Sequence, residues 1–146
     1  PRARPQPRRT ARPVRPTLRS RMPDPSPSDG PGGTTQIDVP TRHGTARVHL
    51  DAPGRPARAA LVLGHGAGGG VDAPDLLAVR DVAVDAYWLV ARVEQPYRVQ
   101  GRRMPPRAPT LDGAWEDVVA ALAAGALAGL PVVVGGRSSG ARVACR

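Results

Sequence analysis

The sequence has 146 residues, a length that fits one domain with a single hydrophobic core. Its formal net charge is +9, but eight of the 21 basic residues lie within residues 1–21, where there is no acid, and the remainder is close to neutral. A nucleic-acid-binding surface is therefore not expected on the folded part. The single cysteine, Cys145, excludes an internal disulfide and a thiolate metal cluster. The apolar runs are also too short to predict a membrane span.

The N-terminal segment is rich in Pro, Arg, Gly and Ser and shows no apolar periodicity. We predict that residues 1–35 form a disordered Arg/Pro-rich tail, because such a composition cannot bury enough apolar surface to offset the entropy of ordering. The segment lacks the apolar stretch of a secretory signal. A basic arm that contacts nucleic acid is the alternative for this tail. Residues 36–146 form the predicted domain.

The first half of this domain predicts three strands. Alternating apolar and polar residues at 36–40 and 45–50 indicate two half-buried strands joined as a hairpin. The continuous apolar run at 59–64 is typical of a strand that is covered on both faces. The segment HGAGGG at 65–70 follows it and must form an irregular glycine-rich turn.

The second half alternates between helical and strand-like patterns. We predict a helix at 73–86, a strand at 87–94, a long loop at 95–109, a helix at 111–129, a strand at 132–136 and the start of a last helix. Strands that alternate with helices imply right-handed crossovers and a parallel sheet. The predicted fold class is therefore α/β, with a mostly parallel sheet and antiparallel N-terminal strands.

The first of two glycine motifs fits the dinucleotide fingerprint G-x-G-x-x-G, through Gly64, Gly66 and Gly69. Glu94, at the end of the next predicted strand, could hold a ribose. Residues 71–74 nevertheless separate the last glycine from any helix start. A dinucleotide-binding Rossmann-like module therefore remains an alternative that accounts for this motif alone.

The second motif, Gly136-Arg137-Ser138-Ser139-Gly140, fits G-x-S-x-G between a predicted strand and a predicted helix. This spacing suits a nucleophile on a sharp turn, because the flanking glycines avoid a collision with the crossing backbone. Ser138 would then be the nucleophile, and the N–H of Ser139 would face the oxyanion. The alternative is a tight turn in which a serine only caps the helix.

Three segments, LVLGHGAGGG, RVEQPYR and VVVGGRSSGARVACR, resemble the α/β hydrolases of the dienelactone-hydrolase-like group, which includes the KANL/Tex-type α/β-hydrolase-like domain. The resemblance extends over residues 36–146. It implies a serine hydrolase that attacks an ester, a lactone or a related carbonyl of a small molecule through an acyl-enzyme, in the cytoplasm and with no cofactor or metal. The implied site contains the nucleophile Ser138, the oxyanion donors Ala67 and Ser139, and the supporting residues His65, Gly66, Gly68, Gly136 and Gly140.

A catalytic acid and base are not apparent. The eight residues after Ser138 include no Asp, Glu or His, and His65, which lies in the glycine-rich turn, is expected to shape that turn rather than act as the base. We therefore expect an N-terminal part of an α/β-hydrolase domain, truncated after the nucleophile turn, inactive by itself and prone to aggregate along an unpaired strand edge. A non-catalytic hydrolase-like interaction domain is the third functional alternative.

Overall fold

A computed structural model describes residues 32–146, and residues 1–31 of the predicted tail lie outside this part. The elements are β1 (Thr34–Thr41), β2 (Gly44–Asp51), β3 (Ala59–Gly64), α1 (Pro74–Asp85), β4 (Trp88–Glu94), α2 (Pro96–Val99), α3 (Ala108–Ala124), β5 (Val132–Gly136) and α4 (Ser139–Ala144). The predicted boundary of the tail at residue 35 is corrected: Thr34 and Thr35 already belong to β1, where they pair with Asp51 and Leu50.

The five strands form one sheet in the order β1-β2-β4-β3-β5. β3 runs parallel to both β4 and β5, whereas β2 runs antiparallel to β1 and to β4. The predicted α/β class and the antiparallel N-terminal strands are thereby confirmed. Because β3, β4 and β5 are parallel, the segments that follow them leave the same edge of the sheet.

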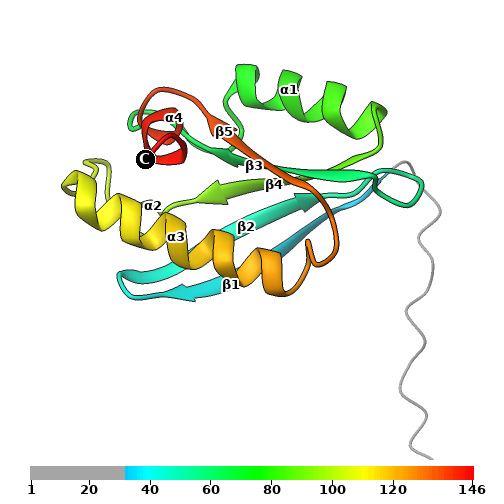
Figure 1. The fold of residues 1–146 in the computed structure, drawn as a ribbon. Coiled ribbons are helices and arrows are strands. Elements are labelled where there is room, and N and C mark those ends of the chain that lie inside the picture. Colours follow the sequence, from blue (N-terminus) through cyan, green and yellow to red (C-terminus); the bar gives the residue numbers. More distant parts are fainter. Residues whose placement is uncertain (1–31) are drawn as a thin grey trace, which may run out of the picture.

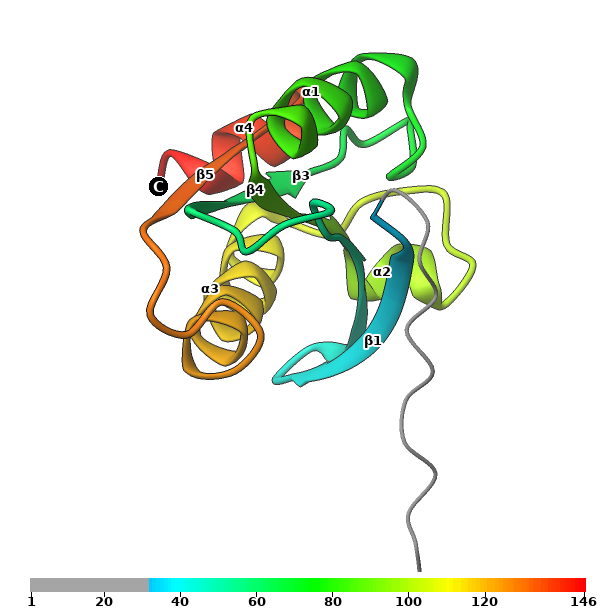
Figure 2. The same cartoon turned by 90° about the vertical axis from the view of Figure 1, so that its right-hand side faces the viewer.

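Helices cover both faces of the sheet, with α1 on one side and α3 on the other (Figures 1 and 2). The larger core lies under α3, where Trp115, Val118 and Leu122 pack against Val62 and Val93 of the sheet. Full burial of an apolar side chain of this size contributes about 1.5–3 kcal/mol. The stripe of apolar residues at helical spacing therefore accounts for the position of α3.

The observed helices differ from the predicted ones in three places. The predicted loop at 95–109 contains the short helix α2, which begins at Pro96, a residue whose fixed φ suits a first helical turn. α3 begins earlier and ends earlier than predicted, since Pro109 lies in its first turn and Gly125 closes it. α1 buries only Leu76 and leaves Val79 46% exposed, so the apolar residues of this helix are only partly covered.

Within the described residues, none of the helices has both the length and the apolar character needed to cross a bilayer.

Candidate functional site

The turn between β5 and α4 has an unusual backbone at Ser138, with φ 52° and ψ −111°. Residues other than glycine are rarely found with positive φ, and such a conformation costs on the order of 1–3 kcal/mol. The surrounding backbone holds it: the Arg137 N–H donates to Gly64 O at 3.0 Å, and the Gly140 N–H donates to Arg137 O at 2.9 Å. The predicted sharp turn at Ser138 is therefore present.

The two glycines that flank this turn lie against the end of β3. A Cβ on Gly136 would stand 2.4 Å from the carbonyl oxygen of Gly64, and a Cβ on Gly140 would stand 2.2 Å from the same atom. Real Cβ atoms do not approach backbone this closely. Gly136 and Gly140 therefore allow the backbone of the turn to cross close to β3, as the G-x-S-x-G spacing predicts.

The side chain of Ser138 is exposed and makes no helix-capping hydrogen bond, so the helix-cap alternative for this residue is wrong. A Cβ on Gly66 would meet Ser138 Cβ at 3.5 Å, which places the serine beside the glycine-rich turn. Of the two serine hydroxyls in the motif, only that of Ser139 forms a hydrogen bond among the described residues, at 3.4 Å to His65 O. The Ser138 hydroxyl has no hydrogen-bond partner within residues 32–146.

The glycine-rich turn after β3 carries a backbone N–H group, that of Ala67, which is available to a ligand. Gly66 O accepts the N–H of Gly69 at 3.2 Å, which folds the turn back on itself. Within residues 32–146, the N–H groups of Ala67 and Ser139 donate no hydrogen bond to the backbone. Gly68 is the exposed tip of the turn, where nothing lies within 4 Å of a Cβ added to it. The structure thus brings the segments of Ala67, Ser138 and Ser139 to one place, through the contact between Gly66 and Ser138.

His65 is buried, with 2% of its surface exposed. Its Nδ1 lies 2.8 Å from Gly66 O, and its Nε2 lies 3.2 Å from the backbone N–H of Gln95. Burial lowers the pKa of His65, and the charge of Arg98 lowers it further against the opposing carbonyl of Gly66. The ring is therefore neutral, donates from Nδ1 and accepts at Nε2. Both nitrogens are occupied, so His65 holds the turn in place and is not free to serve as a base for Ser138.

Two residues after β4 complete the support of the turn and were not predicted as part of the site. The hydroxyl of Tyr97 lies 3.4 Å from Ala67 O, and the Gln95 backbone contacts His65. Both are buried. Two signals in the sequence pointed to them: both lie in RVEQPYR, one of the segments that carry the family resemblance, and both follow a strand directly, where ligands of open α/β sheets bind.

The geometry does not support the alternative of a dinucleotide-binding site. α1 begins at Pro74, five residues beyond Gly69, so the third glycine does not pack a helix start against the strand as the fingerprint requires. The guanidinium of Arg137 also lies over this segment, 3.4 Å from the Cβ position of Gly69, and pairs with Asp75 at 2.8 Å. Of the three glycines in this motif, only Gly64 is crowded, since a Cβ there would stand 3.0 Å from Gly140 Cα at the crossing of α4.

The described residues also contain no cluster of three or more His, Cys, Asp or Glu side chains placed to hold a metal ion.

His43 packs against α3, where its Nε2 lies 3.0 Å from the Cβ position of Gly113. His49 lies in β2 opposite Arg92 of β4. The acid and the base of a triad are therefore not assembled around Ser138 within residues 32–146.

Comparison with known proteins agrees with this geometry. Residues 57–146 match the model of the alpha/beta hydrolase domain. No curated protein matches the sequence. Similar solved structures include an alpha-beta serine hydrolase homologue from Coxiella burnetii, with TM-score 0.67 and 10% identity over 75% of this chain and 54% of that chain. Another is a dienelactone hydrolase from Anabaena variabilis, with TM-score 0.68 and 17% identity over 79% of this chain and 56% of that chain.

A Pyrobaculum calidifontis esterase has a TM-score of 0.61 and 24% identity over 77% of this chain and 37% of that chain. This chain thus spans about half the length of the first two of these structures, and less of the third. Identities this low show a shared fold. Together with the family model, which covers more than half of the sequence, they show that the chain belongs to the α/β-hydrolase domain family.

Proposed function

We propose that this chain carries the nucleophile and the oxyanion donors of a serine hydrolase. Ser138 attacks the carbonyl carbon of an ester, a lactone or a related small-molecule substrate, and the leaving group departs to give an acyl-serine that water then hydrolyses. The observation that carries this proposal is the strained φ of 52° at Ser138, with a free, exposed hydroxyl beside the glycine-rich turn. Backbone strain of this kind concentrates at functional sites.

The two free N–H groups support the proposal from a second direction. Ser139 follows the nucleophile directly, and Ala67 lies in the turn after β3, which are the two places from which hydrolases of this fold supply oxyanion donors. Donors that are fixed in advance stabilise the tetrahedral intermediate without reorganisation. His65 and Tyr97 fix the turn that carries Ala67.

A general base and its orienting acid must come from outside residues 32–146 for efficient acylation, because a serine hydroxyl without a base is a weak nucleophile at neutral pH. We therefore expect residues 1–146 alone to react slowly, and the same residues within their natural polypeptide to react fast. A protein that lacks any base would instead be the non-catalytic alternative.

The test is labelling with a fluorophosphonate probe, followed by mapping of the modified peptide by mass spectrometry. It compares residues 1–146 with the natural polypeptide encoded around them. We expect the label on Ser138 in the natural polypeptide, its loss in Ser138→Ala, and its retention in Ser139→Ala. Ser139 is the matched control, because it is the adjacent serine and its hydroxyl faces His65 O.

A label that persists in Ser138→Ala would refute the assignment of the nucleophile. A natural polypeptide that folds and shows no label at all would favour the non-catalytic interaction domain.

A further inference from the structure

Residues 65–73, here named the connecting segment, join β3 to α1, and four of them are glycines. Glycine leaves the backbone free to adopt many conformations and brings no side chain that could fix it. The direction of the Ala67 N–H, one of the two proposed oxyanion donors, therefore depends on contacts that other elements make with this segment.

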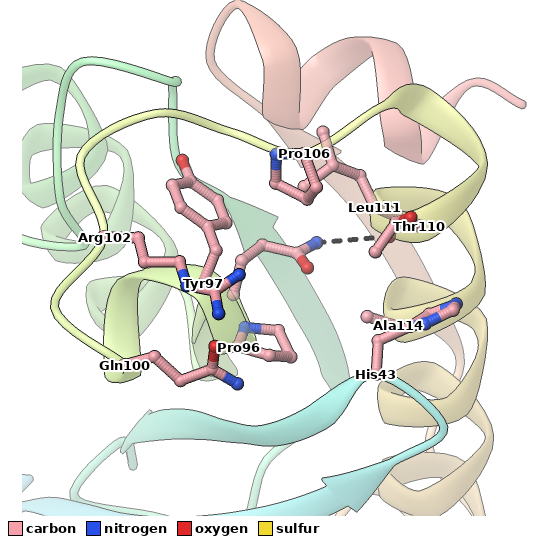
Figure 3. A pocket seen from close by; sticks show the side chains of 10 residues that line it. His43, Pro96, Tyr97, Gln100, Arg102, Pro106, Thr110, Leu111 and Ala114 are labelled. Carbon is pink, nitrogen blue, oxygen red and sulfur yellow. Dashed lines mark hydrogen bonds between the residues drawn. The ribbon is translucent and has the colours of Figure 1, made fainter.

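The first half of the connecting segment is held by the hydrogen bonds of His65 and Tyr97. Figure 3 shows Tyr97 on the wall of a pocket that Arg102 and Pro106 also line. This anchor therefore belongs to α2 and to the loop that follows it. The second half of the segment, which leads into α1, needs an anchor of its own.

The side chain of Arg92 in β4 provides that anchor, and only 3% of it is exposed. Its Nη1 donates to Val71 O at 3.0 Å and to Asp72 Oδ1 at 2.8 Å. Its Nε donates to Asp51 Oδ2 at 2.8 Å, and its Nη2 donates to Oδ1 of the same carboxylate at 3.2 Å. One rigid, planar guanidinium thus joins the second half of the connecting segment to β2.

The buried groups of this network are charged and well supported. Burial opposes the charge of Arg92, but hydrogen bonds to Asp51 and Asp72 keep the pKa of Arg92 above its ordinary value. Burial also opposes the charge of Asp51, and hydrogen bonds from Arg92 and Thr34 hold the pKa of Asp51 below its ordinary value. Arg80 of α1 lies 3.6 Å from the same carboxylate. Asp51 is therefore a firm base for Arg92.

Stability alone does not account for this arrangement. A buried ion pair adds little stability over apolar packing of the same volume, because both charges lose their hydration. The carboxylate of Asp51 occupies one edge of the guanidinium, and the other edge is directed at the connecting segment. A group that bonds in two fixed directions is suited to hold one part of the molecule at a set distance from another.

We propose that Arg92 is a positioning residue of the candidate site, which fixes the second half of the connecting segment and thereby the direction of the Ala67 N–H. Arg92 acts through the segment, since its hydrogen bonds go to Asp51, Val71 and Asp72. This inference rests on the proposed function, because the direction of that N–H matters only if it binds an oxyanion.

The first measurement is amide hydrogen exchange in the ¹⁵N-labelled chain. It follows Gly69 and Ala73, whose N–H groups form hydrogen bonds inside the connecting segment. Val118 of α3 is fully buried on the other face of the sheet and reports global unfolding. A lysine ammonium cannot hold both edges of the network, so in Arg92→Lys both segment amides should exchange at least about tenfold faster relative to Val118.

Asp72→Ala is a second variant that perturbs the core less, because the side chain of Asp72 is 77% exposed. It removes one of the two bonds from Arg92 to the connecting segment and leaves Asp51 paired, so the segment amides should exchange about threefold faster. Asp81→Ala is the matched control: it removes the same charge from an exposed ion pair with Arg80, at 2.6 Å in α1. It should leave the exchange of both segment amides within about 1.5-fold of the parent.

The second measurement is the turnover of p-nitrophenyl acetate by the natural polypeptide, expressed per site that the fluorophosphonate labels at Ser138. An oxyanion donor acts in the transition state, so Arg92→Lys should lower kcat at least about tenfold and leave KM within about twofold. A purely structural role would reduce the number of labelled sites and leave kcat per site unchanged. If the parent is not labelled at Ser138, the proposed function fails and the positioning role falls with it, while the exchange rates still show whether Arg92 holds the segment.

The proposal is overturned if Gly69 and Ala73 exchange no faster relative to Val118 in the two variants than in the parent. It is also overturned if Arg92→Lys keeps the kcat per labelled site of the parent. If Arg92→Lys does not fold, Asp72→Ala decides both measurements.

Discussion

The close crossing of α4 over β3 makes Gly140→Ala a sharp test of the turn at Ser138. The added methyl would stand 2.2 Å from Gly64 O, 2.3 Å from Gly64 C and 2.7 Å from His65 O. All three atoms belong to backbone, so no side chain can rotate away. Because carbon atoms pack at about 3.5–4 Å, α4 would have to move by more than about 1 Å.

That displacement stretches the bond from the Arg137 N–H to Gly64 O and loosens Val143, which is buried in the core under α3. Overpacking of a well-packed site costs about 1–3 kcal/mol, and the lost hydrogen bond adds about 1 kcal/mol. The better helix propensity of alanine returns about 1 kcal/mol. We therefore expect the free energy of unfolding to fall by about 2 kcal/mol, which is about 8 °C in Tm for a domain of this size.

The measurement is urea unfolding followed by circular dichroism and by the fluorescence of Trp115, which is buried. Gly135→Ala is the matched control, because a Cβ there meets only Leu63 Cδ2 at 3.9 Å, an ordinary contact. This control should be neutral, or more stable by up to about 1 kcal/mol because alanine restricts the unfolded chain. If Gly140→Ala unfolds within about 0.5 kcal/mol of the parent, α4 does not lie this close to β3.

Three further predictions concern strain, protonation and the sheet edge. Ser138→Gly should raise the free energy of unfolding by about 1 kcal/mol, because glycine relieves the strain of the positive φ. Ser138→Ala should leave the free energy of unfolding unchanged. Equal stability of the two variants would show that the backbone is not strained. Because burial lowers the pKa of folded His65, its contribution to stability is present above the ordinary value of 6.5 and is lost as the pH falls below it. Urea titrations should give a slope of at most about 1.4 kcal/mol per pH unit from this group, and His65→Asn should lack it; identical pH profiles would contradict the buried neutral ring. Val133 lies on the edge strand β5 and is 46% exposed, so Val133→Lys should reduce light scattering at high protein concentration. The free energy of unfolding should change by less than about 0.5 kcal/mol. Unchanged scattering would exclude this edge as the site of association.

The strands were predictable because their apolar patterns report burial on one or both faces. β3, a continuous apolar run, lies between two parallel neighbours, whereas the alternating β2 leaves part of its length half-buried. α2 was missed because one helical turn has no periodicity to detect, and prolines and arginines at 95–109 favour a loop by composition. The length of β1 was underestimated because Thr34 and Thr35 are held by pairing with β2, which is not encoded in their own residue types.

The residues of the candidate site also differ in whether their roles could be predicted from the sequence. Gly136, Ser138 and Gly140 could be recognised because a crossing of backbones imposes a local rule on residue size. The roles of Gln95 and Tyr97 could not, because they arise from contacts across about 30 positions of sequence with His65 and Ala67. The partial exposure of α1 was equally hidden, since an apolar stripe states which face can be buried and not what covers it.

The strained turn is held by backbone and not by the serine side chain. The N–H of Arg137 is anchored to Gly64 and the N–H of Gly140 to Arg137 O, while Ser138 O accepts the N–H of Arg142 at 3.2 Å. The hydroxyl of Ser138 adds no capping bond to this set. Glycine at this position would carry less strain, and alanine would fold equally well, so stability gives no reason for a serine. Its presence on an exposed, strained turn beside two free N–H groups supports the proposal that Ser138 is a nucleophile.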